Sequence, residues 1–447
     1  MSKFLTPTGT KNLWLGFILV ILCGLLLVPV TSAASTPIYG PTVITEPGSY
    51  YLASSIVNST EPVAILIQCS NVVLDGKSKT IDGTDQAESV GIKVYNAAMT
   101  LVNVVVKNVI CTDWATGVFI NDVKNSVFEK ITAKSNTEDG ILVGHSTDNS
   151  FNKLTAIDNG RVGLLLYDGS NLNTISNVLS QNNGDDGIRL RYSNGNVVQK
   201  SKILGNKYQG IDLFQSNHNT ITQNTITANG ANAIYLNDEC NLNIITKNTA
   251  TGHLTTTAIP VSNSDYNEIS SNTIKDNMYG IYLYAGSENN IISNNILQNN
   301  SMDGLYLNDD ANDNLVYGNT IKQNAGTGLT LNGVDDNVIF GNYVRENKIQ
   351  GVNIAGNAKD NVIFNNYFYN TNNTKFVTTS ANTWNLTYGN VKSITGGKYS
   401  GGNSWGQPNG QGFSQATPDS HGDGICDSAY AMATNNIDKL PLKYKRK

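Results

Sequence analysis

A repeat of about 23 residues is the feature that most restricts what this chain can fold into. Residues 210–229 read GIDLFQSNHNTITQNTITAN and residues 280–299 read GIYLYAGSENNIISNNILQN, which share the pattern G-I-x-L-x-x-S-x-x-N-x-I-x-x-N-x-I-x-x-N. Fainter copies begin at Ala64 and Gly91, so we expect about 12 coils, or turns of a solenoid, and 13 if the segment from Ile44 is counted. The small residue that opens each copy precedes an aliphatic residue and recurs every 22 to 25 residues, at Gly117, Gly140, Gly163, Gly187, Gly210, Ala233, Ala258, Gly280, Gly304, Gly328 and Gly351.

Each repeat reads as three short strands joined by corners that carry Asn. Apolar residues alternate with polar ones, and no stretch reaches the roughly ten residues that a helix needs. The chain has 63 Asn against 41 Gly and 10 Pro. Asn tolerates left-handed corners, and equivalent Asn side chains in coils about 4.8 Å apart can bond to one another as ladders. Leucine-rich repeats carry one Asn per repeat, so three Asn favour an all-β, three-sided parallel β-helix.

The ends of the chain depart from the repeat. An apolar run at residues 13–30 follows Lys3 and Lys11 and precedes small residues, so we expect residues 1–34 to be a signal peptide or an uncleaved signal anchor. The remaining chain is then extracellular or at the cell surface, with membrane contact only through an uncleaved anchor. We expect an N-terminal cap and first coils at residues 38–116, regular repeats at 117–370 and an irregular C-terminal cap at 371–447.

Charge and cysteine content exclude several classes of protein. The formal net charge is −5, so the chain has no basic field for nucleic acid. Cys69, Cys111, Cys240 and Cys426 are far apart in the sequence and lack the spacing of a zinc site or a disulfide framework. We expect them to be small buried hydrophobic residues.

Several short segments outside the regular repeats are distinctive: ITEPGSYYL (44–52), LDG (74–76), IDG (81–83), GGNSW (401–405), DGICD (423–427) and DKLPL (438–442). Through these segments the chain resembles NosD-type right-handed β-helix proteins of the carbohydrate-binding and sugar-hydrolase group. Its ending is similar to that of secreted archaeal members, notably from methanogens. The resemblance implies a right-handed β-helix in a cell-surface setting that binds carbohydrate.

The same family is usually described as periplasmic and copper-binding. Copper sites need clustered His, Met or Cys side chains. The four His residues (His145, His218, His253 and His421) are scattered, and the chain has no Met-rich tract. The sequence therefore argues against copper, and a copper-related accessory role is kept as the third hypothesis.

One face of the predicted β-helix gathers charged and aromatic residues. If the first and third residues after each opening Gly point inward, the second and fourth point outward. This face then carries four candidate catalytic residues: Asp185, Asp186, Arg189 and Asp212. The candidate glycan-binding residues are Tyr167, Arg191, Phe214, Tyr235, Tyr282, Tyr284 and Tyr306.

These residues allow a functional and a structural interpretation. Aromatic rings can stack on sugars, Arg can bind carboxylates through its planar fork, and paired carboxylates can act as acid and base. Alternatively, Arg189 and Asp212 form a plain ion pair between coils, and Arg191 makes a cation–π stack between Tyr167 and Phe214. Both interpretations stay open at this point.

Polygalacturonases share this fold and offer a partial match. Asp185-Asp186 and Asp212 resemble their Asp pair and third Asp. However, Gly144-His145-Ser146 precedes the Asp pair instead of following it, and Arg189-Leu190-Arg191 replaces their Arg-x-Lys. The match to this enzyme class is therefore incomplete.

A possible calcium loop lies near the C-terminus. Asp419, Asp423 and Asp427 occupy positions 1, 5 and 9 of an EF-hand-like turn, with Gly424 at position 6. His421 at position 3 is a poor calcium ligand. The turn is thus either a structural calcium site or a metal-free cap.

These observations give three hypotheses for function. The first is a secreted or cell-surface β-helix that binds polysaccharide or cell-envelope glycan, or serves as an envelope component, without catalysis. The second is a polysaccharide lyase or glycoside hydrolase that acts on an acidic glycan along the Tyr/Arg/Asp face. The regular repeat length leaves no long loops to wall a catalytic cleft, so we favour the first.

Overall fold

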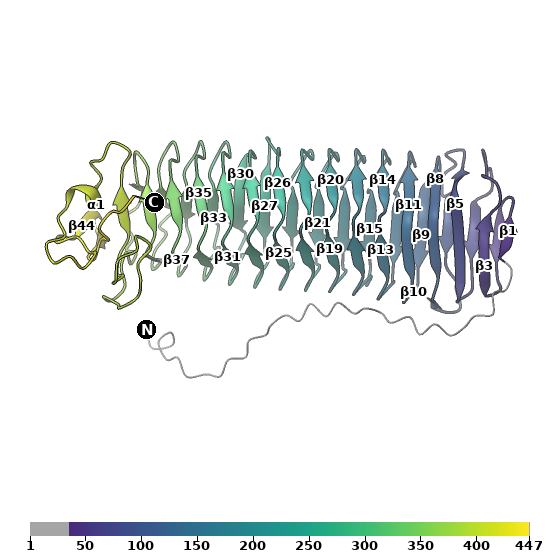
Figure 1. Cartoon of the computed structure of the whole chain (residues 1–447), viewed down its shortest axis with the longest axis horizontal. Coiled ribbons are helices and arrows are strands. Elements are labelled where there is room, and N and C mark those ends of the chain that lie inside the picture. The colour runs from purple at the N-terminus through teal and green to yellow at the C-terminus, as the bar shows by residue number, and fades with distance from the viewer. Residues whose placement is uncertain (1–34, 447) are drawn as a thin grey trace. The chain divides into compact units, whose positions relative to one another are not determined.

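The computed structural model describes residues 35–446, and the expected signal segment at 1–34 lies outside them. These residues form a parallel β-solenoid whose coils stack one after another from the N-terminal to the C-terminal end (Figure 1). Within residues 35–446, no helix has both the length and the apolar character needed to cross a membrane.

The first of three series of parallel strands forms a sheet of its own. Its 15 strands correspond to about 15 turns, so the expected number of about 12 was too low. The turn that contains β42 was not predicted, because β42 lacks the Gly-aliphatic signature of the repeat. The strands are β2 (Thr42–Ile44), β4 (Val63–Ile67), β6 (Val90–Val94), β9 (Thr116–Asn121), β12 (Ile141–Gly144), β15 (Leu164–Tyr167), β18 (Ile188–Arg191), β21 (Ile211–Phe214), β24 (Ile234–Asn237), β27 (Thr257–Ser262), β30 (Tyr279–Tyr284), β33 (Leu305–Asn308), β36 (Leu329–Asn332), β39 (Val352–Ala355) and β42 (Thr374–Phe376).

The second and third series are continuous as one 26-stranded sheet, because the long strand β11 pairs with a strand of each series. The second series is β1 (Thr36–Ile38), β3 (Gly48–Leu52), β5 (Val72–Asp82), β8 (Val105–Thr112), β11 (Val127–Lys134), β13 (Ser150–Asn152), β16 (Thr174–Ser176), β19 (Val197–Gln199), β22 (Thr220–Thr222), β25 (Ile244–Thr246), β28 (Glu268–Ser270), β31 (Ile291–Ser293), β34 (Leu315–Tyr317), β37 (Val338–Phe340) and β40 (Val362–Phe364). The third is β14 (Thr155–Ile157), β17 (Leu179–Gln181), β20 (Lys202–Leu204), β23 (Thr225–Thr227), β26 (Thr249–Thr251), β29 (Thr273–Lys275), β32 (Ile296–Gln298), β35 (Thr320–Lys322), β38 (Tyr343–Arg345), β41 (Tyr367–Tyr369) and β43 (Ser404–Gly406).

The core is a set of stacked aliphatic rows. On β21, Ile211 and Leu213 are fully buried, while Asp212 and Phe214 point to the other side. The neighbouring coil places Ile188 against Ile211 and Leu190 against Leu213. This register confirms the alternation expected for the first sheet.

Asn ladders run along the inner side of the corners, as expected. In one ladder the backbone N–H of Asn272 donates to Asn295 Oδ1 at 2.9 Å, and that of Asn295 donates to Asn319 Oδ1 at 2.9 Å. The ladder residues are not themselves left-handed: in the regular coils the residue before a ladder Asn, such as Ser271 (φ 57°), takes that conformation. The two roles expected of Asn are therefore divided between neighbouring positions.

The C-terminal segment closes the last coils with irregular structure. It contains the short helix α1 (Phe413–Ala416) and the antiparallel pair β44 (Tyr430–Ala433) and β45 (Asn436–Asp438). A separate parallel pair, β7 (Leu101–Val102) and β10 (Val123–Lys124), lies among the N-terminal coils. Asp438 is fully buried and accepts hydrogen bonds from the backbone N–H of Asn403 and from Trp405 Nε1, both at 2.8 Å. A buried carboxylate thus fixes the cap to the final coil.

Candidate functional site

The predicted charged face lies on the outer side of β18 and β21. These strands pair in parallel so that Arg189 lies beside Asp212 and Arg191 lies beside Phe214. Tyr167 on β15 lies beside Arg191 in the preceding coil. The structure therefore brings these predicted site residues together.

Arg189 is held by three carboxylates. Its Nη2 atom lies 3.0 Å from Asp185 Oδ1, and its Nε atom lies 2.6 Å from Asp186 Oδ2. The same Nε atom is 3.4 Å from Asp212 Oδ2. The ion pair between coils that was the structural alternative is thus present, within a larger cluster.

The bond made by Asp186 to the next coil recurs elsewhere in the solenoid. Asp186 Oδ1 accepts the backbone N–H of Gln209 at 2.8 Å. At equivalent positions, Asp139 and Asp303 accept the backbone N–H of the next coil at 3.0 and 2.7 Å. Asp186 therefore has a structural role that does not depend on the charged face.

Burial raises the pKa of two carboxyl groups in this cluster, Asp186 and Asp212. Burial, only partly offset by Arg189, raises the pKa of Asp186 to about 6. Burial and the neighbouring Asp186 raise the pKa of Asp212 to about 7. Near neutral pH, Asp212 is therefore able to exchange a proton.

A shallow pocket of about 230 Å³ opens on this face, lined by Arg189, Arg191, Asp212 and Phe214. The Arg191 guanidinium packs 5.2 Å from the centre of the Tyr192 ring and 5.8 Å from that of Phe214. Within residues 35–446, no carboxylate pairs with Arg191. The pocket thus contains one neutralised and one available guanidinium.

Two aromatic neighbours of the pocket were not predicted. The Tyr192 ring packs edge-on against Phe214, with ring centres 5.6 Å apart, and His145 packs edge-on against Tyr167 at 6.2 Å. Both are corner residues with positive φ, and they follow the strand positions from which the face was predicted. A prediction that included the first corner residue would have found them.

The remaining tyrosines form a second cluster farther along the first sheet. The rings of Tyr282 and Tyr306 stack with their centres 4.7 Å apart and an interplanar angle of 8°. The hydroxyl groups of Tyr235 and Tyr284 form a hydrogen bond of 2.9 Å. Tyr279, which precedes an opening Gly and was not predicted, packs 6.1 Å from Tyr306. Stacked rings cover part of one another's faces, so less ring face is left for a sugar.

The acidic turn in the cap is held together by its own backbone. Asp419 accepts the N–H groups of Asp423 and Gly424 at 3.1 and 3.0 Å. Asp427 accepts the Ser420 hydroxyl at 2.6 Å. These bonds order the turn without an ion, and calcium binding stays a prediction.

The donor atoms that copper prefers are separated or already bonded. His253 is buried in an Asn ladder, where its ring nitrogens lie 3.3 Å from Asn229 Nδ2 and 3.0 Å from Asn277 Oδ1. Burial raises the pKa of the Cys240 thiol to about 12 and keeps it protonated. In the described part of the chain, no three His, Cys, Asp or Glu side chains are grouped to hold a metal ion. The residues present do not fit a copper site.

Three faces of stacked parallel strands, with the polar site on one of them, define a parallel β-helix protein. The family described as periplasmic copper-binding protein (NosD) matches residues 70–257, 155–306 and 238–410. These matches overlap and together cover more than half of the sequence. The chain belongs to the NosD family.

Several solved structures resemble this chain, whereas no curated protein matches its sequence. A double mutant of the periplasmic alginate epimerase AlgG is 13% identical, with 72% of this chain and 80% of that chain covered and a TM-score of 0.47. The A-module of the mannuronan C-5 epimerase AlgE4 from Azotobacter vinelandii is 15% identical, with 69% and 87% covered and a TM-score of 0.42. A mutant tailspike of the E. coli bacteriophage HK620, in complex with a pentasaccharide, is 12% identical, with 78% and 58% covered and a TM-score of 0.39.

Proposed function

We propose that this NosD-family protein is an extracytoplasmic β-helix that binds an acidic polysaccharide on its first sheet without cleaving it. The observation that carries the proposal is the pocket beside Arg191, whose guanidinium has no carboxylate partner in residues 35–446. A planar guanidinium can bind a uronate carboxylate through two hydrogen bonds.

The other groups of the pocket suit a sugar ring next to that carboxylate. Phe214 supplies an apolar surface, and Asp212 supplies a polar edge that is partly protonated near neutral pH. Arg189 is already paired with three carboxylates, so Arg191 is the guanidinium left to bind an anion. Binding through one exposed cation also predicts a marked dependence on salt.

Glycoside hydrolysis is less well supported because it needs two usable carboxyl groups. Asp186 is fully buried, with one oxygen bonded to Gln209 and the other to Arg189. Of the predicted catalytic carboxylates, only Asp212 lines the pocket. One carboxyl group in a shallow pocket supports binding better than hydrolysis.

A lyase that removes a proton beside the uronate carboxylate is the second candidate. It is favoured by the position of Asp212 in the pocket beside Arg191, where burial raises the pKa of Asp212 to about 7, near the value that suits a general base. Arg191 would then neutralise the substrate carboxylate. A copper-related role is not favoured, because no set of described residues fits the metal.

The test uses the protein from about Ser35 with polygalacturonate, alginate and neutral dextran, each with calcium or with chelator. We expect co-sedimentation with an acidic polymer and no formation of unsaturated product or new reducing ends. Arg191→Gln should weaken binding about tenfold or more, because it removes a charge-assisted bond. The control is Lys202→Gln, which also removes one positive charge. Lys202 is exposed on β20, in another sheet, so this variant should bind normally.

Two results would refute this proposal. Equal binding of dextran and the acidic polymers would show that no anion is recognised. Turnover that disappears in Asp212→Asn would make the protein an enzyme and establish the lyase.

A further inference from the structure

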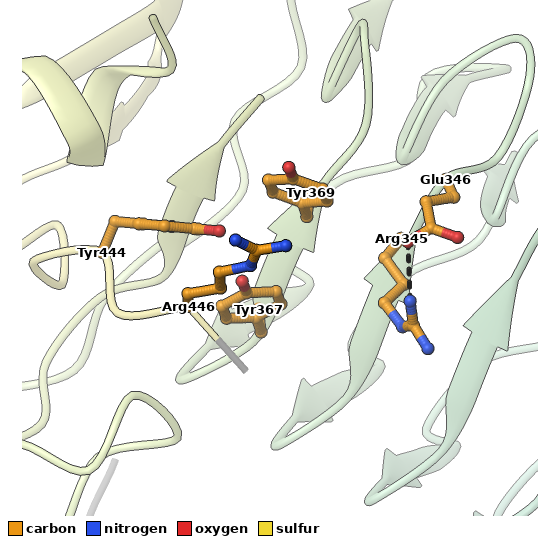
Figure 2. Close-up of a pocket in the computed structure, with 6 residues that line it drawn as sticks. All are labelled: Arg345, Glu346, Tyr367, Tyr369, Tyr444 and Arg446. Atoms are coloured by element: carbon orange, nitrogen blue, oxygen red, sulfur yellow. Dashed lines mark hydrogen bonds and ion pairs between the residues drawn. The ribbon is translucent and has the colours of Figure 1, made fainter. Parts of the chain in front are cut away.

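A second hollow, of about 200 Å³, lies on the third series of strands near the C-terminal end. Figure 2 shows the six residues that line it: Arg345, Glu346, Tyr367, Tyr369, Tyr444 and Arg446. Tyr444 and Arg446 belong to the C-terminal tail, whereas the other four come from β38, β41 and the corner after β38. The hollow therefore forms only where the tail returns to the solenoid.

A missing side chain makes room for the tail. Arg345 pairs with Tyr369 in the next coil, and Tyr369 pairs with Gly406 in the coil after that. A Cβ atom on Gly406 would lie 2.6 Å from the Tyr444 ring. Tyr444 thus occupies the place of the absent side chain, and its ring stacks on Tyr369 with the centres 5.9 Å apart.

The charges of the hollow favour an anion. Arg345 Nη1 donates to Glu346 Oε1 at 2.6 Å, and Gln323 Nε2 donates to the other oxygen of Glu346 at 2.9 Å. Both oxygens of this carboxylate are therefore engaged. Arg345 keeps further N–H donors, and in the described part of the chain no carboxylate pairs with Arg446. Two guanidiniums and one carboxylate leave the hollow one positive charge.

We infer that this hollow is a second binding site, specific for a carboxylate-bearing sugar unit. The guanidiniums of Arg345 and Arg446 hold the carboxylate, and the parts of the Tyr369 and Tyr444 rings that stay exposed offer aromatic surface to the sugar ring. This site lies on a different series of strands from the pocket of Arg191 and shares no residue with it. A protein with both sites could connect two glycan chains, which goes beyond the function proposed above.

Calorimetric titration of the protein from about Ser35 with trigalacturonate tests this inference. We expect two sites per chain, and one site after Arg446→Gln. Arg345→Gln should weaken the binding of trigalacturonate at the hollow beside Arg446 about tenfold or more. Lys348→Gln, which removes a positive charge from an exposed neighbour in the same coil that does not line the hollow, should keep both sites.

The failure of this site is distinguishable from the failure of the first. Two sites retained in Arg446→Gln, or equal displacement of trigalacturonate by sodium sulfate at this site, would overturn the inference. Loss of a site in both Lys348→Gln and Arg446→Gln would overturn it as well, because charge alone would explain the binding. If Arg446→Gln removes a site and Arg191→Gln removes none, the second site stands and the proposed function fails.

Discussion

At the scale of single residues, buried ionisable groups make the stability of this fold depend on pH. Asp438 in the cap has no cationic partner and is bonded only to neutral donors. Burial, opposed by those hydrogen bonds, raises the pKa of Asp438 to about 7. This pKa is higher in the folded than in the unfolded chain. Folding is therefore accompanied by proton uptake at pH values between the two pKa values.

Asp438→Asn tests this linkage. The stability linked to Asp438 is fully present below pH 4 and is lost as the pH rises through about 7. We expect the wild-type protein to lose about 2 kcal/mol more than the variant between pH 5 and pH 8. The measurement is urea unfolding at both pH values. Identical pH dependence in both proteins would contradict the prediction.

Arg189 is a second residue whose removal has a definite expected effect. Arg189→Met leaves Asp185, Asp186 and Asp212 close together without their shared cation. We expect the free energy of unfolding at pH 8 to fall by about 3–5 kcal/mol, and by less at pH 5, where Asp186 and Asp212 take up protons. Arg161→Met, whose ion pairs are both 3.7 Å long, is the control and should cost less. Equal losses at both pH values would argue against the cluster.

At the scale of elements, the Asn ladders hold the corners of successive coils at one spacing. His253 interrupts one ladder, where its backbone N–H and its ring both bond to Asn277 Oδ1. Burial lowers the pKa of His253 to about 4, even though the bond to Asn277 opposes this change. This coil junction is therefore expected to weaken in acid.

His253→Asn should remove that weakness. The folded-state pKa lies below the ordinary 6.5, so the stability linked to His253 is present above that pH and is lost as the pH falls toward about 4. Between pH 7 and pH 5, we expect the variant to lose about 2 kcal/mol less than the wild-type protein. His218→Asn, at an exposed corner, should behave like the wild-type protein. Thermal unfolding at the two pH values gives the comparison.

The strands and the ladders could be predicted because a single pattern repeats many times. The outward columns followed from alternation, so the sequence was enough to place Arg189 beside Asp212. The hollow at Tyr444 and Arg446 could not be predicted, because these residues lie outside the repeat and meet β38 and β41 only through the fold of the tail. The last coil was missed for the same reason, since residues 374–376 no longer follow the repeat.

At the scale of the whole molecule, each coil is stabilised mainly by its neighbours, so the stability of the solenoid depends on how its two end coils are covered. The cap includes the turn of Asp419, Asp423 and Asp427, for which calcium binding is untested. In the structure, Asp419 and Asp427 accept hydrogen bonds from within the turn itself. We therefore expect the cap to stay folded without the ion.

Removing calcium tests this expectation directly. With excess EGTA, we expect the unfolding temperature to stay within about 1 °C of the value in calcium, because no binding energy is lost. Asp423→Asn is the comparison variant. A fall of several degrees in EGTA that is absent from this variant would show that the turn is a calcium site.

The ring of Tyr444 in the place left by Gly406 has a consequence for the order in which the chain folds. Coils can form successively as the polypeptide is made, since each one contacts only the coils next to it. The final coil must wait for a segment almost forty residues downstream. The C-terminal end is therefore completed late, and we expect a protease present during synthesis to cleave the chain there.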